Sequence, residues 1–325
     1  MNMQEVAAKA IASRVQVGGI TKVCFVACGG SIAAFYPAKF LLEKESKNLT
    51  RIGYYTANEF VKATPEFVDQ NTLVIGCSHE GKTPETVAGL KLAQEKGAAT
   101  IAFTLFPETE ITNYGDQTVV YSWGANVVYS QKKEALGLRL AMELLSQIEN
   151  WPKYEQAMSS FERYDQVALK AREKAIPQAQ KFAQENALEK VLYTVGSGAA
   201  WGSAYMECIC ILMEMQWIHS NCIHSGEFFH GPLEIVDTET PFLLMMGDGS
   251  TRELDERVKT FLEKWGRKYT IIDVKDYGIN VLDNEVVEFF SPLLLTAVVD
   301  VYNQNLAQVR KHPLSTRRYM WKVAY

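Results

Sequence analysis

The chain contains 325 residues, with 33 lysines and arginines against 38 aspartates and glutamates, which gives a formal net charge of −5. Hydrophobic residues make up 47% and charged residues 22%, an ordinary globular composition, and the length favours two domains. The acidic balance argues against nucleic acid as a partner, and no apolar run reaches the roughly 18–20 residues of a membrane helix. The six cysteines include no Cys-x-x-Cys pair, so we interpret them as buried thiols of a cytoplasmic protein.

The predicted elements, in chain order, follow the same plan twice. An amphipathic helix over residues 1–15 precedes an apolar strand, a Gly/Ser turn and a helix within 22–44, and this plan returns at 190–215. Continuous apolar runs of this kind are typical of strands in a parallel sheet that helices cover on both faces. The further predicted strands are 51–57, 71–78, 99–106, 117–123, 222–236, 241–247, 268–274 and 287–290.

Strands that alternate with helices predict right-handed βαβ units, and therefore an α/β fold with a doubly wound, flavodoxin-like parallel sheet in each half. We assign residues 1–151 to a first domain and residues 188–325 to a second. Residues 152–187 should form a helical linker that Pro177 breaks or kinks. Ligands of such sheets bind at the carboxyl ends of the strands, so the turns there are the candidate sites.

The turn after the first strand, Cys28 to Ser31, contains two adjacent glycines. Small residues such as Gly30 let backbone N–H groups approach an anion, and the helix that follows adds its positive N-terminal end. A tight turn without any ligand is an equally good interpretation of so short a segment.

A second loop, from Gly76 to Thr83, satisfies the P-loop pattern G-x-x-x-x-G-K-T. Its position after the third strand, the lack of a following acidic motif for magnesium, and Glu80 within the loop argue against a nucleoside triphosphate. A phosphate monoester needs only hydroxyls, amides and one cation, which Ser78, Lys82 and Thr83 supply. We therefore expect a monophosphate here, with a structural turn as the alternative.

A third turn, Gly196 to Gly202, is close to a dinucleotide fingerprint, but its spacing differs and no acidic residue ends a following strand. A nicotinamide cofactor is therefore not expected. The acidic residues Glu207 and Glu214 lie instead in a predicted helix over 203–217, where a spacing of seven should place them on one side. A carboxylate among apolar neighbours should have a raised pKa, which suits a general base, and Glu214 is the candidate.

The segment after this helix gathers imidazoles and a carboxylate: His219, His224, Glu227 and His230. Their spacing matches no standard zinc pattern, so we expect no metal. Gly231-Pro232 should fix a turn that aims the His230 imidazole at a ligand. Ser225 has the residue type and position of a helix N-cap.

These residues together resemble the sugar isomerase (SIS) superfamily over nearly the full length of the chain. The similarity is carried by the turn 28–31, the loop 78–83 and the run SGEFFHGPLEI. A glutamate, Glu214, lies sixteen residues before the histidine of that run, His230. Gly-Glu-x-x-His-Gly-Pro-Leu is similar to the isomerase half of glucosamine-6-phosphate synthase. Three short motifs more closely resemble the fructosamine-6-phosphate deglycases: VACG, the G-K-T form of the loop, and RRY near the C-terminus.

The resemblance implies that Glu214 and His230 are catalytic. It also implies substrate- and phosphate-binding roles for Gly30, Ser31, Ser78, Gly81, Lys82, Thr83, Glu227 and Arg318. Two positions depart from the family: Glu80 replaces the second serine of the usual loop, and Ile211 replaces a lysine that the synthase has one turn before its glutamate. Both departures argue against simple amino-sugar isomerisation.

The function that the resemblance implies is a deglycase. A fructosamine 6-phosphate, with 6-phosphofructose-aspartate favoured by overall likeness, would give glucose 6-phosphate and the free amino acid without a cofactor. Two alternatives remain open: an aldose–ketose isomerase of sugar phosphates, and a non-catalytic module that binds a sugar phosphate and regulates a partner.

SIS proteins often pair so that one subunit completes the site of the other, and we expect a homodimer with shared active sites. The apolar segment 135–148 fits a dimer interface, or else it covers its own sheet. Arg317, Arg318 and Lys322 are candidates for binding the carboxylate of the amino acid, because a carboxylate needs cations.

Overall fold

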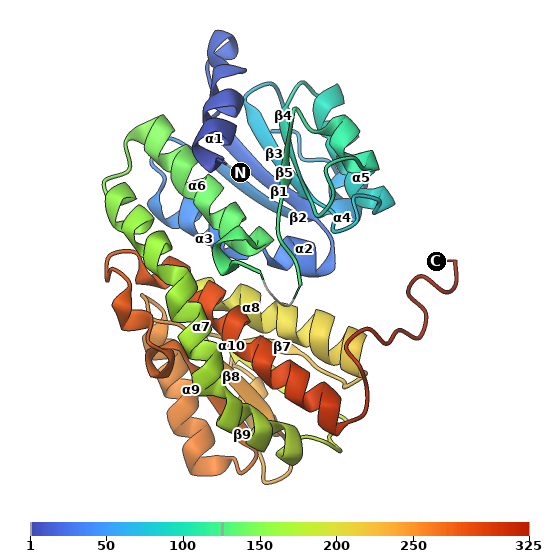
Figure 1. Cartoon of the computed structure of the whole chain (residues 1–325), viewed down its shortest axis with the longest axis vertical. Helices are drawn as coiled ribbons and strands as arrows, with labels where there is room; N and C mark the ends of the chain where they lie inside the picture. Colours follow the sequence, from blue (N-terminus) through green and yellow to red (C-terminus); the bar gives the residue numbers. More distant parts are fainter. Residues whose placement is uncertain (1, 125–126, 325) are drawn as a thin grey trace. The chain divides into compact units, whose positions relative to one another are not determined.

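The computed structural model describes residues 2–124 and 127–324, and the chain divides into two compact units, Met1–Phe161 and Glu162–Tyr325. Each unit is built around its own parallel sheet (Figure 1). Helix α7 (Tyr154–Glu185) begins in the first unit and continues in the second.

The first unit contains a five-stranded parallel sheet in the order β2-β1-β3-β4-β5. This is the flavodoxin-like order, and all five strands predicted in this half are confirmed. Every residue of β3 and β4 is buried, which explains why their sequences are continuous apolar runs. The strands are β1 (Lys22–Ala27), β2 (Arg51–Thr56), β3 (Thr72–Cys77), β4 (Ala99–Thr104) and β5 (Gln117–Val120).

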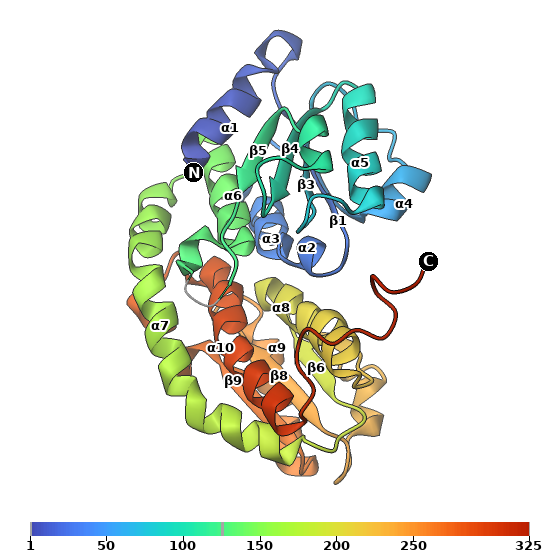
Figure 2. The same ribbon diagram turned by 45° about the vertical axis from the view of Figure 1, so that its right-hand side comes forward.

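Helices cover both faces of this sheet, as a doubly wound fold requires. Helices α1, α3 and α6 lie on one face, and α4 and α5 lie on the other (Figure 2). The helical segments of the unit are α1 (Met3–Ala12), η1 (Val15–Val17), α2 (Gly29–Ala33), α3 (Tyr36–Glu45), α4 (Ala57–Lys62), α5 (Pro84–Glu95), η2 (Glu110–Tyr114), η3 (Tyr129–Gln131) and α6 (Lys133–Glu149).

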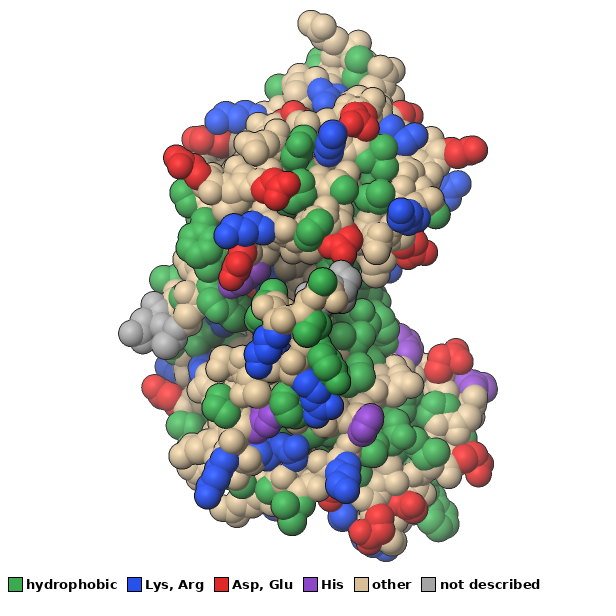
Figure 3. Space-filling view, turned by 90° about the vertical axis from the view of Figure 1, so that its right-hand side faces the viewer, with side chains coloured by type: hydrophobic (Ala, Val, Ile, Leu, Met, Phe, Trp, Pro, Cys, Tyr) green, Lys and Arg blue, Asp and Glu red, His purple; other side chains and the backbone are tan. Residues whose placement is uncertain are grey.

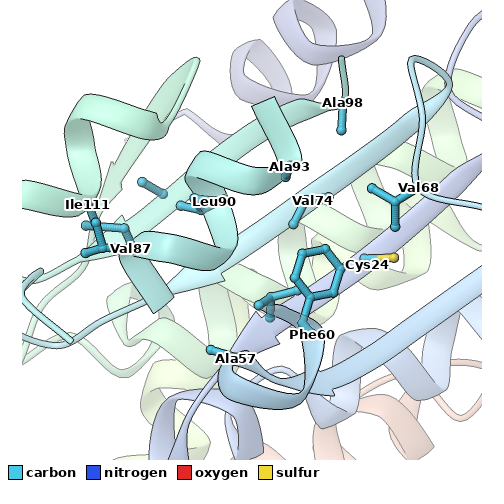
Figure 4. Packing of buried hydrophobic residues seen from close by; sticks show 12 residues of the cluster. Cys24, Ala57, Phe60, Val68, Val74, Val87, Leu90, Ala93, Ala98 and Ile111 are labelled. Atoms are coloured by element: carbon cyan, nitrogen blue, oxygen red, sulfur yellow. The ribbon is translucent and has the colours of Figure 1, made fainter. Parts of the chain in front are cut away.

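The core between the sheet and α4 and α5 is a closed hydrophobic cluster (Figure 4). Phe60 of α4 and Leu90 of α5 pack with Val74 of β3, and all three side chains are fully buried. On the opposite face, the apolar side of α6 packs against α1 and α3 of the same chain. The leucines Leu138 and Leu144 of the 135–148 segment are fully buried, so these side chains pack within their own chain.

The second unit contains a four-stranded parallel sheet in the order β7-β6-β8-β9. Its strands are β6 (Tyr193–Gly196), β7 (Cys222–His224), β8 (Phe242–Met246) and β9 (Tyr269–Asp273). Its helical segments after α7 are η4 (Gly198–Ala200), α8 (Trp201–Met206), η5 (Glu207–Met215), η6 (Pro232–Ile235), α9 (Arg252–Trp265), η7 (Val274–Tyr277), η8 (Ile279–Val281) and α10 (Val287–Val309).

Two strand predictions in this half are wrong. The segment 222–236 pairs with β6 only over β7, and the rest of it forms turns and a short helix. The segment 287–290 is the first turn of α10, a helix that is buried on almost every face. A short apolar run is compatible with a buried strand or a buried helix, and the run in α10 continues far beyond strand length.

The expected break at Pro177 is also absent, since α7 runs through this proline as one 32-residue helix. Proline removes one backbone hydrogen bond from a helix and crowds the preceding turn. Here the buried stripe continues on both sides of it, with Ala175, Ala179 and Phe182 buried at helical spacing. Packing of this stripe therefore outweighs the local cost of the proline.

On the face shown in Figure 3, acidic and basic side chains are interspersed, in line with the small net charge. Within residues 2–124 and 127–324, no helix is both long enough and apolar enough to cross a membrane. All six cysteines are free thiols. Burial raises the pKa of Cys24 to about 12, so this thiol is inert at neutral pH.

Candidate active site

The two predicted turns of the first unit lie next to each other. Strands β1 and β3 are neighbours, and their last residues, Ala27 and Cys77, are paired in the register of the sheet. The chain leaves β1 toward one edge of the sheet and β3 toward the other, so this is the topological switch point where ligands of such folds bind. The turn 28–31 and the loop 78–83 therefore lie next to each other at the carboxyl edge of the sheet, as a candidate site.

The loop is held by hydrogen bonds between its own hydroxyl groups. The Ser78 and Thr83 hydroxyl oxygens are 2.8 Å apart, and the Thr83 backbone N–H donates to the Ser78 oxygen at 3.1 Å. Thr83 is the N-cap of α5, so the positive end of that helix starts in the loop. Lys82 is exposed, whereas Ser78 is buried and Ser31 is half-buried.

Gly81 is required by the geometry of this loop. Its φ is +70°, and a Cβ atom at this position would lie 2.0 Å from the Thr109 hydroxyl oxygen. Gly30 is half-buried as the second residue of α2, and the turn enters that helix through Gly29, which has a φ of +53°. Backbone conformations of this kind favour glycine and bring main-chain N–H groups close to an anion.

Sequence reasoning missed His79, which lies inside the same loop. Its Nδ1 atom is 2.9 Å from the Tyr121 hydroxyl, and Tyr121 is buried at the end of the sheet. Burial, and then the nearby charge of Lys133, lower the pKa of His79 and keep the imidazole neutral at neutral pH. The position of His79 between Ser78 and the glycine of the loop is the signal that could have identified it.

In the second unit, the segment after α8 is a π-helix, η5, over Glu207–Met215. Its hydrogen bonds join residues five apart, so seven residues no longer make two turns as they do in an α-helix. Glu207 and Glu214 therefore do not share a side. Glu207 is 1% exposed, whereas the Glu214 side chain is 22% exposed and faces the C-terminal tail.

Glu214 is ion-paired with Arg317, and 2.7 Å separates its Oε1 atom from the guanidinium Nη2. The guanidinium is 8% exposed. This contact joins residues more than one hundred positions apart, and only the folded tail brings them together.

Glu207, and not Glu214, is the buried carboxyl group with a raised pKa that the sequence predicts in this segment. Its Oε2 atom accepts a hydrogen bond of 2.8 Å from Asn303 of α10. Its Oε1 atom is buried without a partner among the described residues. Burial raises the pKa of Glu207 to about 8, so this carboxyl group is largely neutral at pH 7.

The C-terminal tail packs on the residues that follow the π-helix (Figure 1). The Gln216 amide donates to the His312 carbonyl oxygen at 2.8 Å, and the Trp217 and His312 rings meet edge to face at 4.5 Å. The exposed Arg318 guanidinium lies over the Trp217 ring at 4.3 Å. Arg317 and Arg318 thus both lie beside the Glu214 end of the π-helix.

His230 lies in a run of turns. This run is anchored by the buried ring of Phe228 and by the buried carboxylate of Asp255. Phe228 is fully buried in the core of the second unit, and the Ser225 hydroxyl donates to Asp255 of α9 at 2.6 Å. Ser225 is therefore not a helix cap, since residues 225–231 form turns. The predicted turn after His230 is confirmed, because Gly231 has a φ of +139° and Pro232 begins η6.

Both predicted functional residues of this run point outward, since Glu227 and His230 are exposed. The Glu227 carbonyl oxygen accepts the His230 backbone N–H at 2.9 Å, which closes the turn between them. His224 differs, because its Nδ1 atom accepts the Gly226 N–H at 3.1 Å and burial lowers its pKa. In the described part of the chain, no three His, Cys, Asp or Glu side chains are grouped so that they could hold a metal ion.

The segments that carry Glu214 and His230 lie at opposite ends of strand β6. Just after the π-helix, the His219 N–H donates to the Lys190 carbonyl oxygen, which precedes β6. The turns that carry His230 begin where the Ser225 N–H donates to Gly196, the last residue of β6.

The third glycine turn is closed by internal contacts. The Ser197 hydroxyl donates to Asp255 at 2.7 Å and lies 3.0 Å from the Thr251 hydroxyl. A Cβ atom at Gly198 would lie 2.3 Å from the same threonine. Burial raises the pKa of Asp255 to about 6, and its Oδ1 atom accepts hydrogen bonds from both Ser197 and Ser225. The groups that a ligand would use in this turn thus bind other parts of the protein.

Comparisons with known proteins agree with the fold. Residues 20–131 match the SIS domain family. A fructosamine deglycase from Bacillus subtilis is 42% identical over 306 residues, which cover 94% of this chain and 93% of the relative. The chain belongs to the SIS family. Within this family, the length of that match places it with the fructosamine deglycases, and the sequence-based resemblance is confirmed.

Two further relatives support the same conclusion. A fructoselysine 6-phosphate deglycase from Escherichia coli is 26% identical, with 92% of this chain and 85% of the relative covered. A crystal structure from Salmonella typhimurium, provisionally described as a phosphosugar isomerase, is 45% identical. It matches with a TM-score of 0.95 over 99% of both chains. The expected two-sheet α/β fold is confirmed, as is the expectation of a deglycase-type enzyme.

Proposed function

We propose that this SIS protein is a deglycase that converts a fructosamine 6-phosphate, with aspartate as the attached amino acid, to glucose 6-phosphate and free aspartate. The observation that carries the proposal is the 42% identity to a fructosamine deglycase over 94% of the chain. The paired turns at the switch point of the first unit support a phosphate group as part of the substrate.

In the proposed roles, Ser31, Ser78 and Thr83 donate hydrogen bonds to the phosphate, and Lys82 supplies a charge. Gly30 and Gly81 leave room for the backbone to approach it. Glu80 is exposed, so its carboxylate points into solvent and does not need to oppose the phosphate. A dianionic phosphate monoester is the ligand that this combination of hydroxyls, amides and one cation suits best.

In the chemical step, His230 helps to open the sugar ring, and Glu214 then takes the proton from C1 of the ketose. The C2 carbonyl makes that proton acidic, and the electron pair moves to form an enaminol. Protonation at C2 gives an imine between C1 and the amino-acid nitrogen. Water adds to C1, the C1–N bond breaks, and the amine leaves with a proton. The sequence of steps uses acid–base groups throughout.

We propose that the enzyme acts as a homodimer in which Glu214 of one subunit works with His230 of its partner. The support is the topology of the second unit, where the segments that carry the two residues lie at opposite ends of β6. Exposed Glu227, beside His230, is proposed to contact the same substrate. We also propose a cytoplasmic location, since six free thiols suit a reducing compartment.

The test is an assay of purified protein with the aspartate adduct of fructose 6-phosphate, in which glucose 6-phosphate and aspartate are both measured. We expect equal amounts of the two products, and a loss of about 10²- to 10⁴-fold in E214Q and in H230A. Interconversion of fructose 6-phosphate and glucose 6-phosphate without release of an amino acid would favour an isomerase and contradict the proposal.

A mixing experiment tests the shared site. Each inactive variant has one intact half of the proposed site. When E214Q and H230A are mixed, dissociated and allowed to reassemble, the mixed dimers should therefore regain activity. The control is each variant taken through the same procedure alone, which should stay inactive. A mixture that forms mixed dimers without regaining activity would show that both groups act from one subunit.

A further inference from the structure

The C-terminal tail carries a contact that the proposed mechanism does not use. We propose that Arg317 binds the α-carboxylate of the amino acid in the substrate, and that Glu214 holds this guanidinium only until the substrate replaces it. Arg317 would then be a specificity-determining residue that couples substrate recognition to release of the base. This inference rests on the proposed function.

The guanidinium of Arg317 is held at two of its three nitrogen atoms. Nη1 donates to the carbonyl oxygens of Leu314 and Thr316, at 2.8 and 2.9 Å, which fixes the head group within the tail. Nη2 lies 2.7 Å from Glu214, and the ring centre of Trp321 lies 5.3 Å from the guanidinium carbon. The arginine is thus pre-positioned within the tail, and its ion pair with Glu214 joins it to the π-helix.

The remaining nitrogen, Nε, is buried and has no hydrogen-bond acceptor among the residues that the structure describes. A buried donor without an acceptor costs free energy, so such groups are rare unless a ligand satisfies them. Nε and Nη2 form one edge of the guanidinium, which matches the two oxygen atoms of a carboxylate. A substrate carboxylate on this edge would satisfy Nε and take over Nη2 from Glu214.

The chemistry of the substrate brings a carboxylate to this place. In an amino-acid fructosamine, the nitrogen on C1 is bonded to Cα, which carries the carboxylate. The carboxyl carbon is therefore only three bonds from C1, the atom whose proton Glu214 removes. An arginine in contact with the base is accordingly within reach of the carboxylate of the same substrate.

The test compares three fructose 6-phosphate adducts of one size. The aspartate adduct has both carboxylates, the isoasparagine adduct has its α-carboxylate replaced by a neutral amide, and the asparagine adduct lacks only the side-chain charge. For the wild type, we expect kcat/KM to fall by about ten- to a hundredfold when the α-carboxylate is neutralised, the range for hydrogen bonds to a charged group.

Arg317→Met should reduce this α-carboxylate preference to within about threefold, while its preference for the side-chain carboxylate stays as in the wild type. Arg317→Lys keeps the charge but loses the paired donors, so its α-carboxylate preference should fall between the two. Arg172→Met is the matched control, because it removes an arginine–carboxylate pair with Asp300 on another face of the second unit. It should retain the wild-type preference.

The outcomes separate this inference from the proposed function. A wild-type enzyme that releases no glucose 6-phosphate from the aspartate adduct would overturn the function. A wild type that is active but handles the aspartate and isoasparagine adducts equally would overturn the role of Arg317 alone. The role of Arg317 is also overturned if R317M keeps the full wild-type preference for the α-carboxylate. If R317M does not fold, R317K is judged by the same criterion.

Discussion

Replacement of Glu207 by glutamine should make the stability of the protein less dependent on pH. Glu207 is fully buried, and its pKa rises from the usual 4.5 to about 8 because burial disfavours the charged carboxylate. Since the folded pKa is the higher one, the stability that the neutral carboxyl group contributes is complete below about pH 4.5. It is lost as the pH rises toward about 8.

The magnitude follows from this difference in pKa. At about 1.36 kcal/mol per pH unit, the interval corresponds to about 5 kcal/mol of unfolding free energy lost by the wild type between pH 4.5 and pH 8. Glutamine has nearly the same shape and accepts the same hydrogen bond from Asn303, but it does not titrate. E207Q should therefore gain stability relative to the wild type as the pH rises.

Urea unfolding, followed by circular dichroism at fixed protein concentration from pH 5 to pH 8.5, measures this difference. The matched control is E143Q. Glu143 is equally buried, but Tyr154 donates to it at 2.9 Å and Arg139 lies 3.8 Å away, so its negative charge is compensated. E143Q should be less stable than the wild type throughout this range. A constant difference between E207Q and the wild type across the range would refute the reasoning.

Three further predictions concern the loop 78–83 and the long helix α7. G81A should lower the thermal midpoint and raise KM, since a left-handed φ costs an alanine roughly 1–2 kcal/mol and its Cβ lacks space. G278A, at a φ of +83° in open space, is the control for the φ alone. S78A should raise KM about tenfold with kcat nearly unchanged, because it removes the hydroxyl that contacts Thr83. P177A should raise the thermal midpoint by restoring a helix hydrogen bond, worth up to about 3 kcal/mol.

Each of these has an outcome that contradicts it. Equal losses of stability in G81A and G278A would show that the Cβ of residue 81 finds space after all. A fall in kcat without a rise in KM for S78A would place its hydroxyl at the reacting atoms and away from the phosphate. A lower thermal midpoint for P177A would mean that the proline stabilises the protein through the unfolded chain.

Much of the fold was predictable from the sequence because parallel strands leave a direct signature. Strands β3 and β4 are buried on both faces, so their sequences are largely apolar runs without the alternation of a half-exposed strand. The same signature misled at 287–290, where the apolar run begins a buried helix. Short runs carry no period, and only their continuation separates the two structures.

The candidate site was predictable where the chemistry is local. Ser78, Gly81 and Thr83 lie within six residues, so their spacing alone indicated an anion-binding loop, and the structure gives Gly81 the backbone conformation of such a loop. The relation between Glu207 and Glu214 was not predictable in this way. The sequence of this segment gives no sign of a π-helix. An α-helix would place the two glutamates on one side, whereas the π-helix places them on different sides.

The pairing of Glu214 with Arg317 also lay beyond sequence reasoning. Cations near the C-terminus were visible, but which of them meets the base depends on the path of the tail over Trp217 and His312. A contact between such distant positions is set by tertiary packing, which composition and spacing do not encode. The same holds for Asn303, whose amide binds Glu207 from another helix.

The measurement that tests the central claim most directly is the rate at which purified wild type and E214Q release glucose 6-phosphate from the aspartate adduct. Both proteins should be shown to have the same far-UV spectrum and similar thermal midpoints. The account predicts stoichiometric release of sugar phosphate and amino acid by the wild type, and a rate at least about a hundredfold lower for E214Q. A folded E214Q that works at nearly the wild-type rate would contradict it.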